Sequence, residues 1–219
     1  MNNDLWAIIP AHNEEERIEW VIKGVKDYCK NIIVVDDGSK DNTFNVAKKL
    51  KVIVLRHIVN LGKGAALKTG CEFAIKHNAK KFIFIDSDGQ HDPEDINKFL
   101  EALKEKDIVF SYRVMKGRMP GVLRFGNWFI NKTAKVLFGV KIRDTQCGYR
   151  ALTVDAYQKI KWISTGYNVE SEMVTNTGKK KLRYGEIPIK TVYSDRYKGT
   201  TVIDGIKIVW NMFLWRLRI

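Results

Sequence analysis

The strongest constraint on the fold is a regular alternation of short apolar runs with longer stretches of helical periodicity. The apolar runs predict strands at 5–9, 31–36, 52–55, 82–85 and 108–110. The intervening stretches predict helices at 14–28, 41–50, 65–76 and 93–103. Strands that alternate with helices are typical of a parallel sheet with right-handed crossovers. The sequence therefore predicts an α/β fold with a Rossmann-like, mostly parallel sheet flanked by helices.

The second half of the chain is less regular. Residues 117–121 read as a basic loop, 122–138 as a helix, 186–192 as a strand and 202–217 as a second, apolar-rich helix. No internal repeat or linker is visible, and 219 residues fall within the usual size of one domain. We therefore expect a single domain over residues 1–219.

Composition limits the classes of partner and compartment. The formal net charge of +13 favours an anionic partner, which could be nucleic acid, an acidic membrane surface or a phosphorylated substrate. Three widely spaced cysteines argue against a disulfide framework or a zinc site and fit a reducing cytosol. The chain opens without a signal-peptide pattern and has no run of about 18 apolar residues, so no transmembrane helix is expected.

Polar clusters follow three of the predicted strands, at 10–14, 36–39 and 86–90. The carboxyl ends of parallel strands share one edge of the sheet, which is where ligands bind in such folds. Carboxylates there can hold Mg²⁺ or Mn²⁺ while phosphates complete the coordination shell. Turn chemistry would explain one cluster alone, but three at successive strand ends favour a site. Lys63, in a glycine turn that opens a helix, could contact an anion or simply be solvated.

The strings that carry these clusters are specific enough to indicate a family. They are PAHNEE at 10–15, VDDGSKDNT at 35–43, NLGKG at 60–64 and DSDGQH at 86–91. In order and spacing they resemble glycosyltransferase family 2. The segment DTQCGYRA at 144–151 is most similar to the dolichyl-phosphate mannosyltransferase and polyprenyl-phosphate glucosyltransferase branch. The resemblance implies a GT-A fold, a nucleoside-diphosphate sugar donor of the GDP-mannose or UDP-glucose type, and inversion at the anomeric carbon.

The resemblance, together with the charges and glycine turn noted above, also implies roles for individual residues. Residues 1–115 would bind the donor and Mg²⁺ or Mn²⁺, and 116–200 would bind the acceptor. The metal would be held by Asp86, Asp88 and Gln90, and the catalytic residues would be Asp88, Arg113 and Asp144. The substrate-binding residues would be Pro10, His12, Glu14, Val35, Asp37, Lys63, Asp86, Ser87, Gln90, Arg124, Arg196 and Lys198. Two positions depart from the branch: His12 replaces a usual Tyr, and Gly199 is not followed by Ser-Lys.

The expected acceptor is a polyprenyl phosphate. An alcohol acceptor needs a general base, for which Asp144 is the best candidate, whereas a phosphate is already an anion and needs cations. Arg113, Lys116, Arg118 and Arg124 could supply them, or could belong to a solvated basic loop. The aromatic and basic segment at 201–219 is expected to be an amphipathic helix. It could lie on anionic lipid at the cytosolic face of a membrane, or pack against the sheet.

Three other functions fit parts of the sequence. A family 2 enzyme could instead transfer sugar to a glycan or another hydroxyl acceptor. A nucleic-acid-binding module would use the positive charge, but no recognition motif supports it and the acidic strand ends oppose it, so no nucleic-acid partner is expected. A sugar-nucleotide-forming nucleotidyltransferase would need a glycine-rich loop where Pro10, Ala11 and His12 stand.

Overall fold

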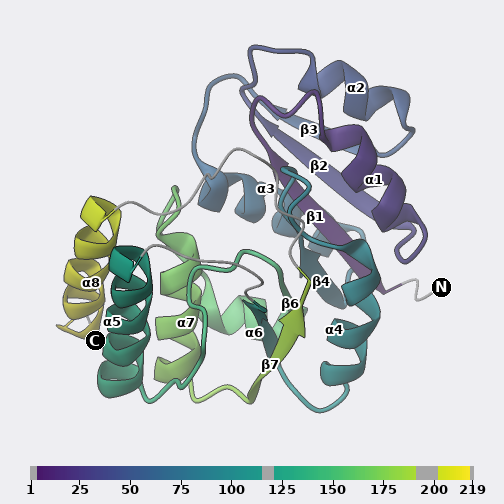
Figure 1. Cartoon of the computed structure of the whole chain (residues 1–219). Helices are drawn as coiled ribbons and strands as arrows, with labels where there is room; N and C mark the ends of the chain where they lie inside the picture. The colour runs from purple at the N-terminus through teal and green to yellow at the C-terminus, as the bar shows by residue number, and fades with distance from the viewer. Residues whose placement is uncertain (1–3, 115–120, 191–201, 218–219) are drawn as a thin grey trace.

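The computed structural model describes the backbone of residues 4–114, 121–190 and 202–217. It also describes their side chains, except those of 121–125 and 202–204. Seven strands form one sheet in the order β3-β2-β1-β4-β6-β5-β7 (Figure 1). They are β1 (Leu5–Ala11), β2 (Asn31–Asp37), β3 (Ile53–His57), β4 (Lys81–Phe84), β5 (Ile108–Arg113), β6 (Arg150–Thr153) and β7 (Tyr184–Ile189).

Strand pairing is parallel except at β6. This strand runs antiparallel to both of its neighbours, β4 and β5, while β7 pairs in parallel with β5. Because β6 pairs with β4, the sheet continues from the first half of the chain into the second. That continuity supports the proposal of a single domain.

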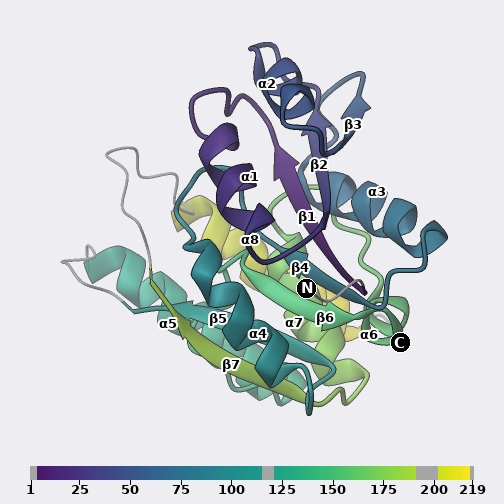
Figure 2. The same cartoon turned by 90° about the vertical axis from the view of Figure 1, so that its right-hand side faces the viewer.

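Helices cover both faces of the sheet. On one face lie α1 (Ile18–Lys26), α2 (Thr43–Lys49), the 3₁₀ turn η1 (Pro93–Asp95) and α4 (Ile96–Ala102). On the other lie α3 (Lys63–Lys76), α5 (Gly121–Phe138), α6 (Val154–Ile160), α7 (Val169–Lys179) and α8 (Val202–Leu217). Figure 2 shows α1 and α4 on one side of β1 and β4, with α3 and α6 on the other.

Strand periodicity divides the core into two clusters. Successive strand residues point to opposite faces, so Ala7 and Ile9 pack with α1 and α4 while Ile8 packs with α3. Both faces are covered, which explains why the strands read as continuous apolar runs rather than alternating ones. The outermost layer is a pair of helices, α5 and α8, which pack against each other and against α7 (Figure 1).

The helix α8 has one face that packs on the protein and one that is exposed. Ile208 and Met212 are buried in the core, whereas Trp210, Phe213 and Leu217 are exposed. The predicted helix at 202–217 is therefore confirmed, and one of its faces packs on the protein.

The expected elements of the first 115 residues are confirmed, with shifted boundaries. The helix expected from residue 14 begins at Ile18, after a turn, and β1 continues through Pro10 to Ala11. Pro10 is tolerated because the pairing of β1 with β4 has already ended at Ile8, so the missing N–H interrupts no ladder there. Three elements of the second half, β6, α6 and α7, were not predicted.

Candidate active site

A cleft of about 1320 Å³ opens at the carboxyl ends of β1, β2, β4 and β5. Residues 10–14 form one part of its lining, and α5, α7 and α8 form the opposite side. The sequence-predicted residues in the lining are Pro10, His12, Glu14, Asp37, Lys63, Asp86, Ser87, Asp88 and Arg113. The structure thus brings together residues from five separate segments of the chain.

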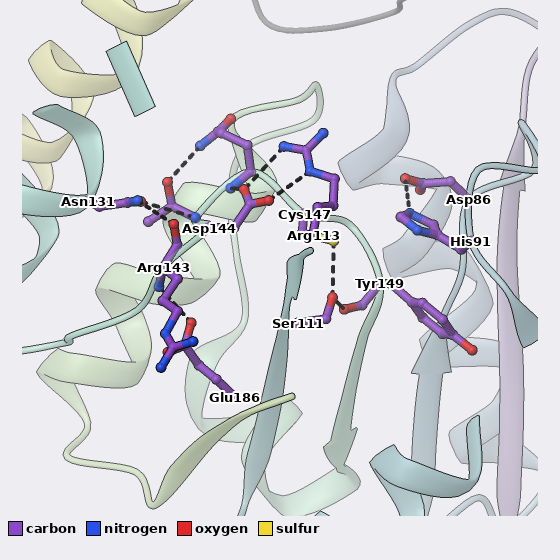
Figure 3. A network of polar contacts seen from close by, with 12 residues as sticks. Asp86, His91, Ser111, Arg113, Asn131, Arg143, Asp144, Cys147, Tyr149 and Glu186 are labelled. Atoms are coloured by element: carbon purple, nitrogen blue, oxygen red, sulfur yellow. Dashed lines mark hydrogen bonds and ion pairs between the residues drawn. The ribbon is translucent and has the colours of Figure 1, made fainter. Parts of the chain in front are cut away.

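A turn that we call the acidic turn, residues 86–90, follows β4 and lines the cleft. Ser87 Oγ donates a hydrogen bond to the carbonyl of Pro10 at 2.9 Å, which fastens the turn to β1. The backbone N–H of Gln90 donates to Asp88 Oδ1 at 3.0 Å. His91 Nε2 contacts Asp86 Oδ2 (Figure 3), and the two atoms are 3.3 Å apart. These contacts hold Asp86 and Asp88 in fixed positions at the base of the cleft.

Lys63, the first residue of α3, bridges two carboxylates. Its Nζ lies 2.5 Å from Asp86 Oδ1 and 2.7 Å from Glu170 Oε1, on α7. Burial opposes the lysine charge, but Asp86 and Glu170 outweigh it and raise the pKa of Lys63. Gly148 lies against this group, since a Cβ there would come within 2.5 Å of Lys63 Nζ. Lys63 is therefore a largely enclosed cation paired with two carboxylates rather than a solvated lysine.

The two aspartates have opposite electrostatic environments. Burial works against ionisation of Asp86, but the charge of Lys63 and the hydrogen bond from His91 lower its pKa. For Asp88, burial and the negative charge of Asp86 raise the pKa. Asp86 has a close cation in Lys63, whereas no ion pair is seen for Asp88 among the described residues, so negative charge is left uncompensated there and a divalent cation would relieve it.

The residues present fit a divalent cation that also contacts a substrate. Carboxylate and amide oxygens from Asp86, Asp88 and Gln90 are hard donors of the type that Mg²⁺ and Mn²⁺ prefer. Within the described part of the chain, no group of three or more His, Cys, Asp or Glu side chains could hold a metal ion. A cation bound here would therefore need further ligands, such as the phosphates of a nucleotide.

Asp37 organises another part of the cleft. Its carboxylate accepts hydrogen bonds from the backbone N–H groups of Leu61 and Gly62, at 2.9 and 2.7 Å. His57 Nδ1 lies 2.7 Å from Asp37 Oδ1, and His12 Nδ1 lies 2.8 Å from the Asp37 carbonyl. In this structure Asp37 thus holds the loop before α3 in place.

Val35 does not lie in the cleft, contrary to the expected contact with the nucleoside. Its side chain is completely buried, in the core cluster that includes α3, where a Cβ on Gly70 would approach its Cγ2 to 3.3 Å. Val35 still belongs to the apolar run of β2, and the polar residues of this segment begin only at Asp36, whose side chain points to the opposite face of the sheet. Gln90 is partly exposed and is not part of the cleft lining.

Arg113, at the end of β5, pairs with Asp144 (Figure 3). Arg113 Nε donates to Asp144 Oδ2 at 2.7 Å, and a second guanidinium nitrogen donates to Oδ1 at 3.2 Å. The backbone N–H of Gln146 also donates to Asp144 Oδ1, at 3.1 Å. Both oxygens of Asp144 are therefore engaged in hydrogen bonds, and the carboxylate fixes the position of the Arg113 guanidinium.

Several expected residues lie outside the described part of the structure. Arg196 and Lys198 fall in the 191–201 segment, and Lys116 and Arg118 fall in 115–120. The backbone of Arg124 belongs to α5, but its side chain is not described. Their roles remain predictions.

Sequence reasoning missed the contribution of α7 to the cleft. Glu170 and its neighbours Tyr167 and Asn168 line the cleft opposite the acidic turn. The available signal was the spacing of Val169 and Met173, which are four residues apart and both buried. That spacing indicates a helix with one buried face, and it places Glu170 next to the core.

An open, mostly parallel sheet with an acidic cleft at the carboxyl ends of its strands places this chain in the class of α/β proteins that bind ligands, nucleotides among them, at that edge of the sheet. Residues 6–161 match the family model for glycosyl transferase family 2. The chain is 38% identical to an uncharacterized protein of Methanocaldococcus jannaschii, over 98% of this chain and 93% of that protein. It is 32% identical to the UDP-N-acetylglucosamine–dolichyl-phosphate N-acetylglucosaminyltransferase of Methanococcus voltae, over 97% of this chain and 96% of that protein.

Comparison with solved structures also finds a glycosyltransferase-like fold. A glucosyl-3-phosphoglycerate synthase of Mycobacterium tuberculosis, solved with Mn²⁺, uridine diphosphate and phosphoglyceric acid, matches with a TM-score of 0.76 at 18% identity. The match covers 98% of this chain and 78% of that one, and at this identity it shows the fold alone. The chain belongs to glycosyl transferase family 2: it is a glycosyltransferase with a GT-A fold, and its relatives lie in the polyprenyl-phosphate branch.

Proposed function

We propose that this glycosyltransferase transfers a sugar from a nucleoside-diphosphate sugar to a polyprenyl phosphate, with a divalent metal and with inversion at the anomeric carbon. The observation that carries the proposal is the composition of the cleft. Its base holds the acidic turn with Asp86 and Asp88, and its far side is an apolar wall formed by α5 and α8. One cavity thus offers a place for a charged donor and a place for a lipid chain.

The donor diphosphate would lie at the acidic turn. Asp86, Asp88 and Gln90 would hold Mg²⁺ or Mn²⁺, which would stabilise the negative charge that develops on the leaving nucleoside diphosphate. Pro10, His12, Glu14 and Asp37 would contact the nucleoside, with a donor of the GDP-mannose or UDP-glucose type. The relatives' names support this donor class, because one of them uses UDP-N-acetylglucosamine.

The acceptor phosphate would lie near Arg113. The bidentate contact with Asp144 fixes the guanidinium group of Arg113 at the cleft wall, where it can orient an anion. A phosphate oxygen is already a nucleophile and needs no general base. This is consistent with an Asp144 whose two oxygens are both engaged. Arg124, Arg196 and Lys198 are proposed to add positive charge to the same region.

The lipid part of the acceptor would use the apolar side of the cleft. Phe129 of α5 and Ile206, Trp210 and Phe213 of α8 line the cleft and are also exposed. Aromatic and aliphatic side chains at a basic protein surface favour a membrane interface with anionic lipid. In the described residues, no helix is long and apolar enough to span a bilayer. We propose peripheral binding to the cytosolic face of a membrane through α8.

The decisive experiment compares acceptors that differ only in the phosphate. Labelled GDP-mannose, UDP-glucose and UDP-N-acetylglucosamine are offered with polyprenyl phosphate and, in parallel, with the dephosphorylated polyprenol. We expect Mn²⁺- or Mg²⁺-dependent transfer to the phosphate alone, and a product whose anomeric configuration by NMR is opposite to that of the donor. Equal transfer to both lipids, or transfer only to a soluble glycan, would refute the polyprenyl-phosphate acceptor and leave the family assignment intact.

A further inference from the structure

Glu170 is a buried carboxylate in the cleft wall, opposite the acidic turn. Glu170 is only 4% exposed, yet it belongs to the lining of the cleft. Its backbone carbonyl accepts a hydrogen bond from Arg150 at 2.6 Å. The same arginine also donates to the carbonyls of Thr145 and Cys147. The start of α7 is thereby tied to the segment that precedes β6, so the position of Glu170 is fixed by the fold.

The hydrogen bonds of this carboxylate are incomplete. Glu170 Oε1 accepts from Lys63, whereas Oε2 is buried and has no hydrogen-bond partner among the described residues. The nearby guanidinium of Arg150 is committed to three backbone carbonyls. A buried, charged oxygen without a donor costs free energy, so an unpaired acceptor in a cleft wall indicates a missing ligand group.

The surrounding charges restrict what that group can be. Asp86 and Glu170 share the ammonium group of Lys63, and Asp88 follows two residues after Asp86, so among the described residues the three carboxylates outnumber the two nearby cations, Lys63 and Arg150, and the local field is net negative. An anionic phosphate would be repelled from Oε2, whereas a neutral hydroxyl or amide N–H could donate to it. In a sugar nucleotide, the sugar is the neutral, hydroxyl-rich part that adjoins the diphosphate.

We propose that Glu170 determines specificity for the donor sugar: Oε2 accepts a hydrogen bond from one hydroxyl or N-acetyl N–H group of the sugar, while Oε1 stays on Lys63. This inference rests on the proposed use of a sugar nucleotide. It makes Glu170 a direct sugar contact, distinct from a residue that only holds Lys63 in place.

The test measures binding of the donor without acceptor. Isothermal titration in Mn²⁺ compares the intact sugar nucleotide, its 2-, 3-, 4- and 6-deoxy analogues and the bare nucleoside diphosphate. The proteins are the wild type, Glu170→Ala and the isosteric Glu170→Gln. The control is Glu72→Gln, which removes the same charge from an exposed position on α3, the helix that begins with Lys63.

We expect one deoxy position to weaken binding to the wild type and to Glu72→Gln by about tenfold or more, as for loss of a hydrogen bond to a charged group. With Glu170→Ala, that penalty should fall to within about twofold of the intact donor. With Glu170→Gln the loss of affinity at that deoxy position should be smaller than in the wild type, because a neutral amide oxygen accepts a weaker hydrogen bond than a carboxylate does. Thermal melting verifies that each variant is folded. If Glu170→Ala does not fold, the comparison of Glu170→Gln with the wild type decides the outcome.

Two outcomes would overturn the inference, and they are distinguishable. If every deoxy penalty is the same in wild type and Glu170 variants, the residue acts only through Lys63, and the proposed function stands. If the wild type binds no sugar nucleotide in Mn²⁺, both the inference and the proposed donor fail.

Discussion

At the scale of single residues, the base of the cleft depends on the absence of a side chain at Gly148. A Cβ there would lie 2.5 Å from Lys63 Nζ and 2.6 Å from Asp86 Oδ2. Gly148→Ala should therefore push this ion pair apart and lower kcat/KM by about tenfold or more, since sub-ångström displacement of positioned groups is costly in catalysis. The control is Gly185→Ala, whose new Cβ would meet only the flexible side chain of Lys106. Equal activity of the two variants would contradict the packing described for the site.

The acidic turn provides the second prediction at this scale. Asp88→Asn should retain the fold but lose most of the activity, because a neutral amide binds a hard cation less well than a carboxylate. Titration of activity with Mn²⁺ should show a weaker apparent metal affinity, by about 10- to 100-fold. Circular dichroism verifies the fold. Wild-type turnover that persists undiminished in EDTA would rule out metal dependence, and full activity of the variant would remove Asp88 from the site.

At the scale of elements, α8 has one buried and one exposed face, and we expect the two faces to have separable functions. Met212 is completely buried in the core, whereas Trp210 is 66% exposed. Met212→Ala should lower the free energy of unfolding by about 2–5 kcal/mol, measured by urea denaturation, because it leaves a cavity. Trp210→Ala should leave that free energy nearly unchanged and weaken sedimentation with anionic vesicles.

The pair of variants also tests the membrane proposal. Vesicle binding by folded Met212→Ala should resemble that of the wild type, because its side chain faces the core. If Trp210→Ala binds vesicles as well as the wild type does, the exposed face of α8 is not the membrane-binding surface.

At the scale of the whole molecule, the net charge of +13 predicts that the proposed membrane binding is electrostatic as well as apolar. Each Lys or Arg near an anionic surface contributes about 1 kcal/mol, and the attraction falls off within a Debye length of about 10 Å at 0.1 M salt. Raising salt from about 0.05 to about 0.5 M should therefore weaken binding to anionic vesicles by about tenfold or more. Binding to neutral phosphatidylcholine vesicles should be weak and insensitive to salt. Salt-independent binding to anionic vesicles would contradict this account.

The sequence by itself determined the alternating elements of the first half and the edge of the sheet where the polar clusters lie. It could do so because hydrophobic periodicity and strand-end position are local properties of the chain. The strings around Asp37 and Asp86 were sufficient to indicate the family, and those residues do share one cleft. The helix over 202–217 was predicted, but its periodicity alone did not show that one face packs and the other is exposed.

The tertiary structure decided which of these residues are partners. Lys63 meets Glu170 because the loop that leads into α7 packs against the start of α3, where Ala65 N–H donates to the carbonyl of Thr165, and nothing local to either segment encodes that contact. The antiparallel insertion of β6 places Gly148 against Asp86, and Arg113 reaches Asp144 from another strand end. The side chain of Val35 lies in the core because the register of a strand sets the face of the sheet on which each side chain lies. Local patterns fix the type of each element, whereas long-range packing fixes which charges meet and so what the cleft can bind.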